Sequence, residues 1–297
     1  MFIHNYITSF LSYLKHERRF SPHTILAYEQ DLSSFSIYLE QETGQIDIVS
    51  ITHKHIRSWI VDLMNQGIIA KSINRKISTL RSFYKFLLSR KEVTVSPLTK
   101  INGLKTPARL PKFVDEKDIQ TLCTEISFPE GFEGKRDKLM IELFYATGIR
   151  LSELVNINEG DIDRHTGNLK VLGKGNKERI IPLHNYLLRE INEFSMLKKN
   201  LFDLESDKLF LTVKGQPVYS KMVYRKVKLY LSMVTTSEKK SPHVLRHSFA
   251  THLLNHGAEL NAVKELLGHS SLAATQVYTH NTIQKLKDVH KQAHPKS

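Results

Sequence analysis

Five residues in the second half of the chain have side chains suited to chemistry on a phosphate. Arg150 and Arg246 carry guanidinium groups, His243 and His269 carry imidazoles, and Tyr278 carries a phenol. Two arginines can bind one phosphate through bidentate, charge-assisted hydrogen bonds. A phenol beside that phosphate is a potential nucleophile. These residue types predict phosphoryl transfer to a tyrosine, a reaction for which no metal is required.

His243 and Arg246 lie three residues apart in a segment that opens with Ser241-Pro242. A serine followed by proline is typical of a helix N-cap and first helical position, and three-residue spacing places two side chains on one helix face. Helix N-termini attract anions, so this pair is a candidate phosphate site. By itself the pair is equally compatible with a surface histidine and a salt-bridged arginine.

The remaining candidates depend on their neighbours in the sequence. Glu153 follows Arg150 by one helical turn and could orient its guanidinium, although an ordinary ion pair would have the same spacing. Lys174 lies between two glycines at the expected tip of a hairpin, from which it could protonate a leaving oxygen or simply be solvated. Tyr278 is one of 11 tyrosines, and no spacing argument alone selects it.

Other chemistries fit the sequence less well. His243, His247, His252 and His256 form two pairs at i, i+4, which can chelate a metal on a helix, but the pairs point to different faces and neither has the His-Glu-x-x-His pattern. A serine hydrolase would need a Gly-x-Ser-x-Gly turn, which the chain lacks. We therefore expect neither a metal nor a cofactor. The single cysteine, Cys123, is expected to be a buried, inert thiol.

The charge balance favours a polyanionic partner. The 297 residues include 43 Lys and Arg against 30 Asp and Glu, a net charge of +13. Duplex DNA carries one negative charge per about 1.7 Å of axis, so it is the natural partner for such a chain, although a solvated basic surface would have the same composition. No apolar run long enough for a membrane span and no signal-peptide pattern is found. We expect a cytoplasmic protein.

The first third of the chain is predicted to be helical, with apolar residues at helical spacing in residues 6–16, 22–40, 53–66 and 71–89. Ser21-Pro22 is predicted to cap the second of these helices and to place proline at its first position. The last of these segments also carries basic residues of one sign only. We predict that they contact DNA phosphates, the alternative being a solvated face; they are Lys71, Arg75, Lys76, Arg81 and Lys85.

Residues 96–114 contain three prolines and scattered basic residues, which predicts a linker. The domains are therefore expected at 1–95 and 115–297. In the second domain, helices are expected at 115–126, 136–146, 185–197, 221–231, from 242 to Gly257, and at 260–267. Two strands, 168–172 and 179–183, are expected to form a hairpin. The fold class is mainly α with a small antiparallel β-sheet.

With these pieces assembled, the sequence resembles the tyrosine recombinase (phage integrase) family, and within it the bacterial Xer recombinases. The ordered family signature Arg, Lys, His-x-x-Arg, His, Tyr is matched in order at family-like distances. Three sequence segments around these residues match the family as well: Ala-Thr-Gly-Ile-Arg-Leu-Ser-Glu-Leu, Gly-Lys-Gly-Asn-Lys-Glu-Arg and Leu-Leu-Gly-His-Ser-Ser-Leu. The matching positions are Arg150, Lys174, His243, Arg246, His269 and Tyr278.

The resemblance implies a two-domain clamp around DNA. Its N-terminal part would be a SAM-like helical core-binding domain, and its C-terminal part an α+β catalytic domain with a tail that docks on a neighbouring subunit. Ile283, Leu286 and Val289 could supply the apolar contact of that tail. The core-binding helices begin almost at residue 1, which favours a Xer-like resolvase over a phage integrase with an additional arm-binding domain.

The resemblance also implies a reaction and a role for each residue. Tyr278 would form a 3′-phosphotyrosine, and two strand exchanges would make and resolve a Holliday junction. Arg150 and Arg246 would stabilise charge on the phosphate, and Lys174 would protonate the leaving oxygen. His243 would take the tyrosine proton or hydrogen-bond the phosphate, and His269 would bond a phosphate oxygen. Glu153 would support this set.

The implied function is chromosome or plasmid dimer resolution by site-specific recombination. The partners would be a duplex DNA site and a homo- or hetero-tetramer formed with a second Xer-like recombinase, with a septal DNA translocase as a candidate accessory. A mobile-element integrase or DNA invertase would use the same chemistry. A type IB topoisomerase shares the tyrosine nucleophile, and a non-catalytic DNA-binding regulator would use only the basic helices.

Overall fold

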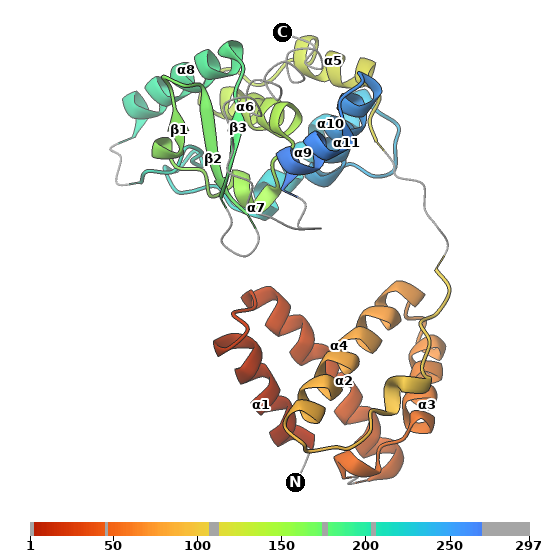
Figure 1. Ribbon diagram of the computed structural model, residues 1–297. Helices are drawn as coiled ribbons and strands as arrows, with labels where there is room; N and C mark the ends of the chain where they lie inside the picture. The colour runs from red at the N-terminus through yellow and green to blue at the C-terminus, as the bar shows by residue number, and fades with distance from the viewer. Residues whose placement is uncertain (1–2, 45–46, 107–112, 174–177, 203–205, 269–297) are drawn as a thin grey trace. The chain divides into compact units, whose positions relative to one another are not determined.

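The chain divides into two compact units, Met1–Arg109 and Leu110–Ser297, each of which is described by itself (Figure 1). The computed structural model describes residues 3–44, 47–106, 113–173, 178–202 and 206–268. Most of these residues are helical, and one small sheet lies in the C-terminal unit. The predicted fold class, mainly α with a small antiparallel sheet, is confirmed.

Among the residues that the structure describes, four helices build the N-terminal unit, and two short 3₁₀ turns accompany them. Ser21 begins the second helix as predicted, because its hydroxyl accepts a hydrogen bond from the Thr24 amide at 3.3 Å and Pro22 occupies the first turn. The elements are α1 (Ile3–His16), α2 (Pro22–Thr43), η1 (Ile48–Ser50), α3 (His53–Asn65), α4 (Ala70–Ser89) and η2 (Pro97–Lys100).

The core of this unit is aromatic. Phe10, Phe35, Trp59 and Phe83 are buried almost completely, and each comes from a different helix. The rings of Phe10 and Phe83 lie 5.4 Å apart, and those of Phe35 and Trp59 lie 4.9 Å apart. Such tilted pairs add to the free energy gained from burial alone. Helical periodicity in the sequence predicted the four helices whose apolar faces meet in this core.

The stretch after α4 packs onto the N-terminal unit before the chain leaves it. Leu98 and Ile101 are buried in its core. The side chain of Asn74 closes on the backbone of Leu104, donating to its carbonyl at 2.9 Å and accepting from its amide at 2.7 Å. Residues 97–104 thus belong structurally to the first unit, although the predicted linker spans 96–114. The exact domain boundaries stay a prediction.

The C-terminal unit places helices around a three-stranded sheet (Figure 1). Its helices are α5 (Glu116–Thr124), α6 (Phe132–Thr147), α7 (Leu151–Leu154), η3 (Glu159–Asp161), α8 (Asn185–Leu201), α9 (Ser220–Val234), α10 (Pro242–Asn255) and α11 (Leu260–Leu267). Helix α6 is the central element, because it packs against α8 and α10 and is buried on all sides from Leu139 to Thr147. A helix that is apolar all round is typical of a core position.

The sheet is antiparallel in the order β1 (Ile162–Asp163), β2 (Asn168–Leu172) and β3 (Glu178–Pro182). In its register Leu169 faces Ile181 and Val171 faces Arg179, and all four side chains are buried. The two predicted strands are confirmed, to within one residue at each end of β3. The sequence missed β1, because two residues are too short for a period-two pattern.

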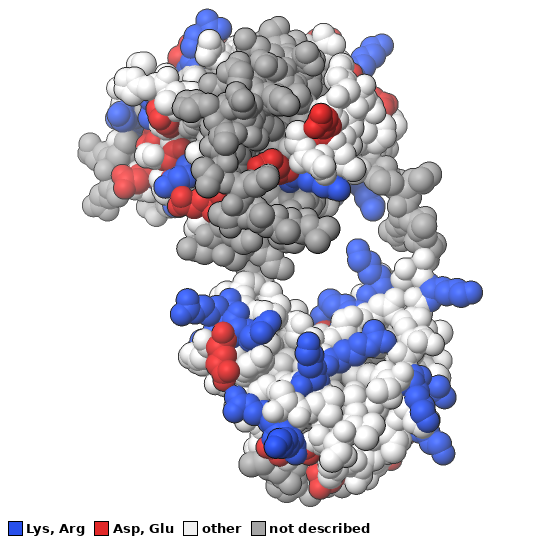
Figure 2. Space-filling view, in the orientation of Figure 1, with Lys and Arg blue, Asp and Glu red and all other residues white. Residues whose placement is uncertain are grey.

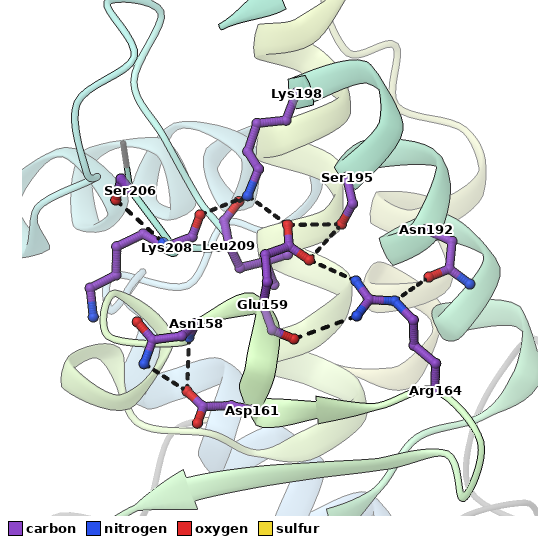
Figure 3. A network of polar contacts seen from close by, with 10 residues as sticks. All are labelled: Asn158, Glu159, Asp161, Arg164, Asn192, Ser195, Lys198, Ser206, Lys208 and Leu209. Carbon is purple, nitrogen blue, oxygen red and sulfur yellow. Dashed lines mark hydrogen bonds and ion pairs between the residues drawn. The ribbon is translucent and has the colours of Figure 1, made fainter. Parts of the chain in front are cut away.

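A buried polar network fastens α8 to the segments that flank the sheet (Figure 3). The ammonium group of Lys198 is fully buried and donates to Glu159 at 2.5 Å and to the carbonyl of Lys208 at 2.7 Å. Glu159 also accepts from Ser195 at 3.0 Å and from Arg164 at 2.6 Å. Because every donor of a buried charge must be satisfied, this network fixes α8 against η3 and against the chain at 208–209.

No helix in the described part of the chain combines the length and the apolar character needed to cross a bilayer.

We expect Lys198→Met to lower the free energy of unfolding by about 3–5 kcal/mol, because it leaves the Glu159 carboxylate without its buried cation. Urea denaturation followed by circular dichroism would measure the change. Lys199→Met, at the exposed neighbouring position, is the matched control and should change stability by less than about 0.5 kcal/mol. Equal losses in the two variants would show that the network does not stabilise the fold.

Candidate active site

A glycine in the left-handed backbone conformation sets the position of Arg150. Gly148 ends helix α6 with φ 56° and ψ 23°. A β-carbon at this position would lie 2.5 Å from Cδ1 of Phe249 and 2.6 Å from Cδ2 of Leu267, closer than any side chain allows. The sharp turn brings Arg150 to the N-cap of α7, where its side chain is 32% exposed. Glycine at position 148 is therefore a structural requirement of this corner.

Arg246 approaches the same corner from helix α10. Ser241 caps this helix as predicted, accepting from the Val244 amide at 3.4 Å. Arg246 is only 5% exposed, and its guanidinium donates to the carbonyls of Gly148 and of Leu267, the latter at 2.6 Å. Both acceptors are far from Arg246 in the chain, so tertiary packing alone creates these contacts.

A carboxylate lies among the guanidiniums. Glu153, with 3% of its side chain exposed, accepts from Nη1 of Arg150 at 2.8 Å and from the Arg150 amide at 2.8 Å. Arg179 of strand β3 binds both oxygens of the same carboxylate, Nη1 to Oε1 and Nη2 to Oε2, each at 2.8 Å. Glu153 is thus shared between two arginines from different elements.

The side chains of the three arginines converge on the C-terminal end of helix α11. A helix leaves its last carbonyls without partners inside the helix and carries partial negative charge at this end. Here three successive carbonyls each accept a hydrogen bond from a different guanidinium. Leu266 accepts from Nε of Arg179 at 2.9 Å, Leu267 from Nη2 of Arg246 at 2.6 Å, and Gly268 from Nη2 of Arg150 at 3.0 Å.

The charges of this cluster do not cancel. Arg150, Arg179 and Arg246 carry three positive charges against the single carboxylate of Glu153. Burial, together with the charges of Arg150 and Arg179, lowers the pKa of Arg246 to about 10. Burial would raise the pKa of Glu153, but hydrogen bonds from Arg179 and Arg150 outweigh it and bring the pKa to about 2. An anion that entered here would relieve the repulsion between cations.

The structure brings together three of the seven residues predicted for the site: Arg150, Arg246 and the supporting Glu153. His243 lies one turn before Arg246 on α10 and is exposed to solvent. Lys174, His269, Tyr278 and the predicted docking tail lie outside the described residues. Gly173 and Gly268, which directly precede Lys174 and His269, are described.

Sequence reasoning missed Arg179. The signal was present, because alternation along residues 179–183 puts position 179 on the same face as the apolar Ile181. An arginine at a core-facing strand position must have a buried anionic partner. The sequence could not say that this partner is Glu153, 26 positions earlier.

The basic residues predicted to contact DNA lie on α4 in different environments. Lys71, Arg75, Arg81 and Lys85 are exposed. Lys76 is half-buried; its ammonium group lies 3.3 Å from the buried carboxylate of Asp31 and 5.8 Å from the centre of the Trp59 ring.

Two of the exposed arginines on α4 also have partners within the N-terminal unit. Arg75 pairs with Asp31, and Arg81 donates to the carbonyl of Ile101 at 2.6 Å. On the visible face of the N-terminal unit, Lys and Arg side chains are scattered over a largely uncharged surface and are more frequent than acidic side chains (Figure 2).

The histidines that could have formed a metal site have other neighbours. His252 lies 3.0 Å from the hydroxyl of Tyr145, and His256 lies 2.6 Å from Glu116. Within the described residues, no three His, Cys, Asp or Glu side chains are grouped so as to hold a metal ion.

Comparison with known proteins gives the class that fits this fold and site. Residues 112–285 match the phage integrase family, and residues 7–91 match the N-terminal SAM-like domain of phage integrases. The chain therefore belongs to the phage integrase family of tyrosine recombinases, as its sequence motifs indicated.

The relatives match along nearly their whole length. A tyrosine recombinase XerC of Staphylococcus carnosus is 38% identical and covers 97% of each chain. A XerC of Chlorobaculum parvum is 36% identical over 98% of this chain and 94% of its own. A tyrosine recombinase XerD of Staphylococcus haemolyticus is 36% identical over 98% and 99%.

Solved structures share the fold at lower identity. The XerH recombinase in a post-cleavage complex with a palindromic difH substrate superposes with a TM-score of 0.73 at 21% identity, over 96% of this chain and 82% of its own. A λ integrase fragment, solved as a dimer on a core site, gives a TM-score of 0.66 at 18% identity, over 94% and 100%.

We expect Glu153→Gln to destabilise the protein by about 2–3 kcal/mol at pH 7, because a carboxyl whose pKa falls on folding stabilises the folded state above its ordinary pKa. This contribution to stability disappears as the pH falls from about 4.5 to about 2. The free energies of unfolding of the variant and of the parent protein should therefore become equal in acid. Urea denaturation at several pH values would measure the difference. Glu178→Gln, at an exposed position on strand β3 beside Arg179, is the control. A Glu153→Gln deficit that is independent of pH would contradict the assignment.

Proposed function

We propose that this protein is a site-specific DNA recombinase of the Xer type, which cuts and rejoins duplex DNA through a 3′-phosphotyrosine intermediate. One observation carries the proposal. The guanidiniums of Arg150 and Arg246 donate to the adjacent carbonyls of Gly268 and Leu267, immediately before His269 and ten residues before Tyr278. Membership of the tyrosine recombinase family supports the same reaction.

In the proposed reaction, the phenol oxygen of Tyr278 attacks the phosphorus of a backbone phosphodiester. A bond forms between tyrosine and phosphate, the bond to the 5′-oxygen breaks, and Lys174 gives that oxygen its proton. His243 accepts the phenol proton or hydrogen-bonds the phosphate, and His269 bonds a phosphate oxygen. The 5′-hydroxyl of a partner strand then attacks the phosphotyrosine and restores the DNA backbone. Bond energy is conserved in the covalent linkage, so no cofactor is required.

The arginine cluster supplies the electrostatic part of this reaction. Free tyrosine has a pKa near 10, so about one phenol in a thousand is ionised at pH 7, and nearby cations increase that fraction. Arg150 and Arg246 would bind the non-bridging oxygens, where charge develops in the transition state. An arginine in such a role accelerates phosphoryl transfer by about 10³–10⁵-fold. The excess positive charge around the buried guanidinium of Arg246 fits a role in stabilising the charge of the phosphate.

The N-terminal unit would hold the other part of the DNA. We propose that residues 1–95 bind one face of the duplex and 115–297 the other, as a clamp. Lys71, Arg75, Arg81 and Lys85 would contact phosphates. Lys76 would act mainly as a support, because Asp31 and Trp59 already hold its ammonium group.

Recombination requires several subunits on two DNA sites. We propose a tetramer of identical subunits or of two Xer-like paralogues, with the C-terminal tail docking on a neighbour. We propose dimer resolution in the bacterial cytoplasm as the setting, with a septal DNA translocase as accessory; the tyrosine recombinases XerC and XerD among the relatives support the Xer-type reaction. A mobile-element integrase would perform the same chemistry; mapping the sites cleaved in the native genome separates the two.

We expect Tyr278→Phe to bind DNA with unchanged affinity and to form no covalent adduct, because only the nucleophilic oxygen is removed. A nicked suicide substrate, analysed on a denaturing gel, would trap the adduct of the parent protein. Tyr219→Phe, which removes an exposed phenol on the same unit, should leave the adduct unchanged. Adduct formation by Tyr278→Phe would disprove the nucleophile assignment, and no adduct with the parent protein would favour a DNA-binding regulator.

We expect the double variant Lys71→Ala/Lys85→Ala to weaken binding to all DNA sequences similarly, because phosphate contacts carry no base information. A plot of the logarithm of the DNA-binding constant against the logarithm of the salt concentration should have a slope that is shallower by about 2, roughly 0.9 for each lost phosphate contact. Fluorescence anisotropy at several salt concentrations would measure it. An unchanged slope would place the DNA elsewhere than on α4.

A further inference from the structure

Arg179 is a buried cation for which the proposed reaction has no role. It lies at the core-facing position of β3 opposite Val171 and is 5% exposed. Its whole guanidinium is engaged: both terminal nitrogens bind Glu153 at 2.8 Å, and Nε donates to the Leu266 carbonyl at 2.9 Å. An arginine this deeply buried and this fully bonded holds its partners in a fixed geometry.

The binding of Arg179 limits how Arg150 can use Glu153. A guanidinium and a carboxylate prefer to pair through two parallel hydrogen bonds. In this cluster Arg179 makes that two-fold pair, so the guanidinium of Arg150 reaches the carboxylate with Nη1 alone. Nη2 of Arg150 remains directed at the Gly268 carbonyl, 3.0 Å away. Without Arg179, Arg150 could rotate onto both carboxylate oxygens and lose that orientation.

Arg179 also changes the charge that Arg150 presents. One carboxylate between two guanidiniums leaves a net charge of +1. If Arg179 were absent, Glu153 and Arg150 would form a neutral pair, and the attraction of Arg150 for a phosphate would fall accordingly.

A second contact connects Arg179 to the end of α11. A β-carbon on Gly268 would lie 3.1 Å from Cδ of Arg179, so the side chain packs closely against this turn, which has φ 63°. Leu266, whose carbonyl Arg179 binds, is three residues before His269. One side chain thus connects β3, the Arg150 corner and the end of α11.

We propose that Arg179 is a positioning residue for the reaction: by occupying Glu153, it keeps the guanidinium of Arg150 oriented and charged for the scissile phosphate. The proposal rests on the proposed function. Arg179 does not contact the DNA; it acts through Glu153 and Arg150.

Four variants test it. Arg179→Met removes the charge and keeps an unbranched apolar side chain. Arg179→Lys keeps the charge but cannot form the two-fold pair. Arg179→Met/Glu153→Gln also removes the charge that would neutralise Arg150. Arg164→Met is the control, since Arg164 pairs with the carboxylate of Glu159 at 2.6 Å, outside the arginine cluster (Figure 3).

The measurements are DNA affinity and the single-turnover rate of covalent adduct formation at saturating protein on a nicked suicide substrate. Rates are taken with an ordinary scissile phosphodiester and with both diastereomers of a methylphosphonate, in which an uncharged methyl group replaces one non-bridging oxygen. An inactive or misfolded fraction lowers the rate on all substrates by the same factor. The comparison between substrates therefore reports the electrostatic role and is independent of folding.

With the phosphodiester, Arg179→Met should cleave about 100-fold more slowly than the parent protein, the size of loss expected when a reacting group is misplaced by about 1 Å. DNA affinity should change less than about threefold. On at least one methylphosphonate diastereomer the deficit should shrink by about tenfold, because a neutral phosphate needs less charge from Arg150. Arg179→Lys should be intermediate, and adding Glu153→Gln should restore part of the lost rate. Arg164→Met should cleave at the parental rate.

Cleavage by Arg179→Met at the parental rate would overturn the proposal. Equal deficits on all substrates, with no recovery from Glu153→Gln, would overturn it as well, since Arg179 would then serve folding alone. Absence of a Tyr278 adduct in the parent protein would instead reject the proposed function.

Discussion

The site depends on holding three guanidiniums within a few ångströms of one another. Like charges at this distance repel, and burial increases the repulsion. Two features offset it: the carboxylate of Glu153, and the three carbonyls at the end of α11 that accept from Arg179, Arg246 and Arg150. The helix end supplies part of the negative charge that the proposed phosphate would bring. The donors are therefore arranged before DNA binds, which is the condition under which electrostatic stabilisation is most effective.

The rest of the C-terminal unit fixes the elements that carry the three arginines. Gly148 turns the chain at a point where Phe249 and Leu267 leave no room for a β-carbon. Central helix α6, buried from Leu139 to Thr147, gives that corner a rigid base. The Lys198–Glu159 pair fixes α8 against η3, the turn that leads into β1. Three guanidiniums around the single carboxylate of Glu153 leave the arginine cluster with a net charge of +2.

In the N-terminal unit, too, a carboxylate lies among basic side chains, but these side chains are part of the basic surface of α4. Asp31 is buried and binds Arg75, Lys76 and Thr79 on one helix. The carboxylate neutralises part of the basic surface of α4 and fixes two of its long side chains, which reduces the entropy they would lose on contacting a phosphate. Arg75 remains half exposed while bound to Asp31, so it can take part in the proposed DNA contact without leaving its internal partner.

Local signals in the sequence determined much of this protein. The bounds of α11 and β2 were predicted residue for residue, and the caps at Ser21 and Ser241 were identified, because glycine, proline and capping residues act on their immediate neighbours. The types of the reactive residues and their order along the chain were also given by sequence. Only the tertiary structure decided which groups meet: Arg246 binds a carbonyl 98 positions away, and Arg179 shares a carboxylate with Arg150. Such contacts are set by the packing of helices and strands distant in sequence, and no local pattern encodes the partner of a buried charge.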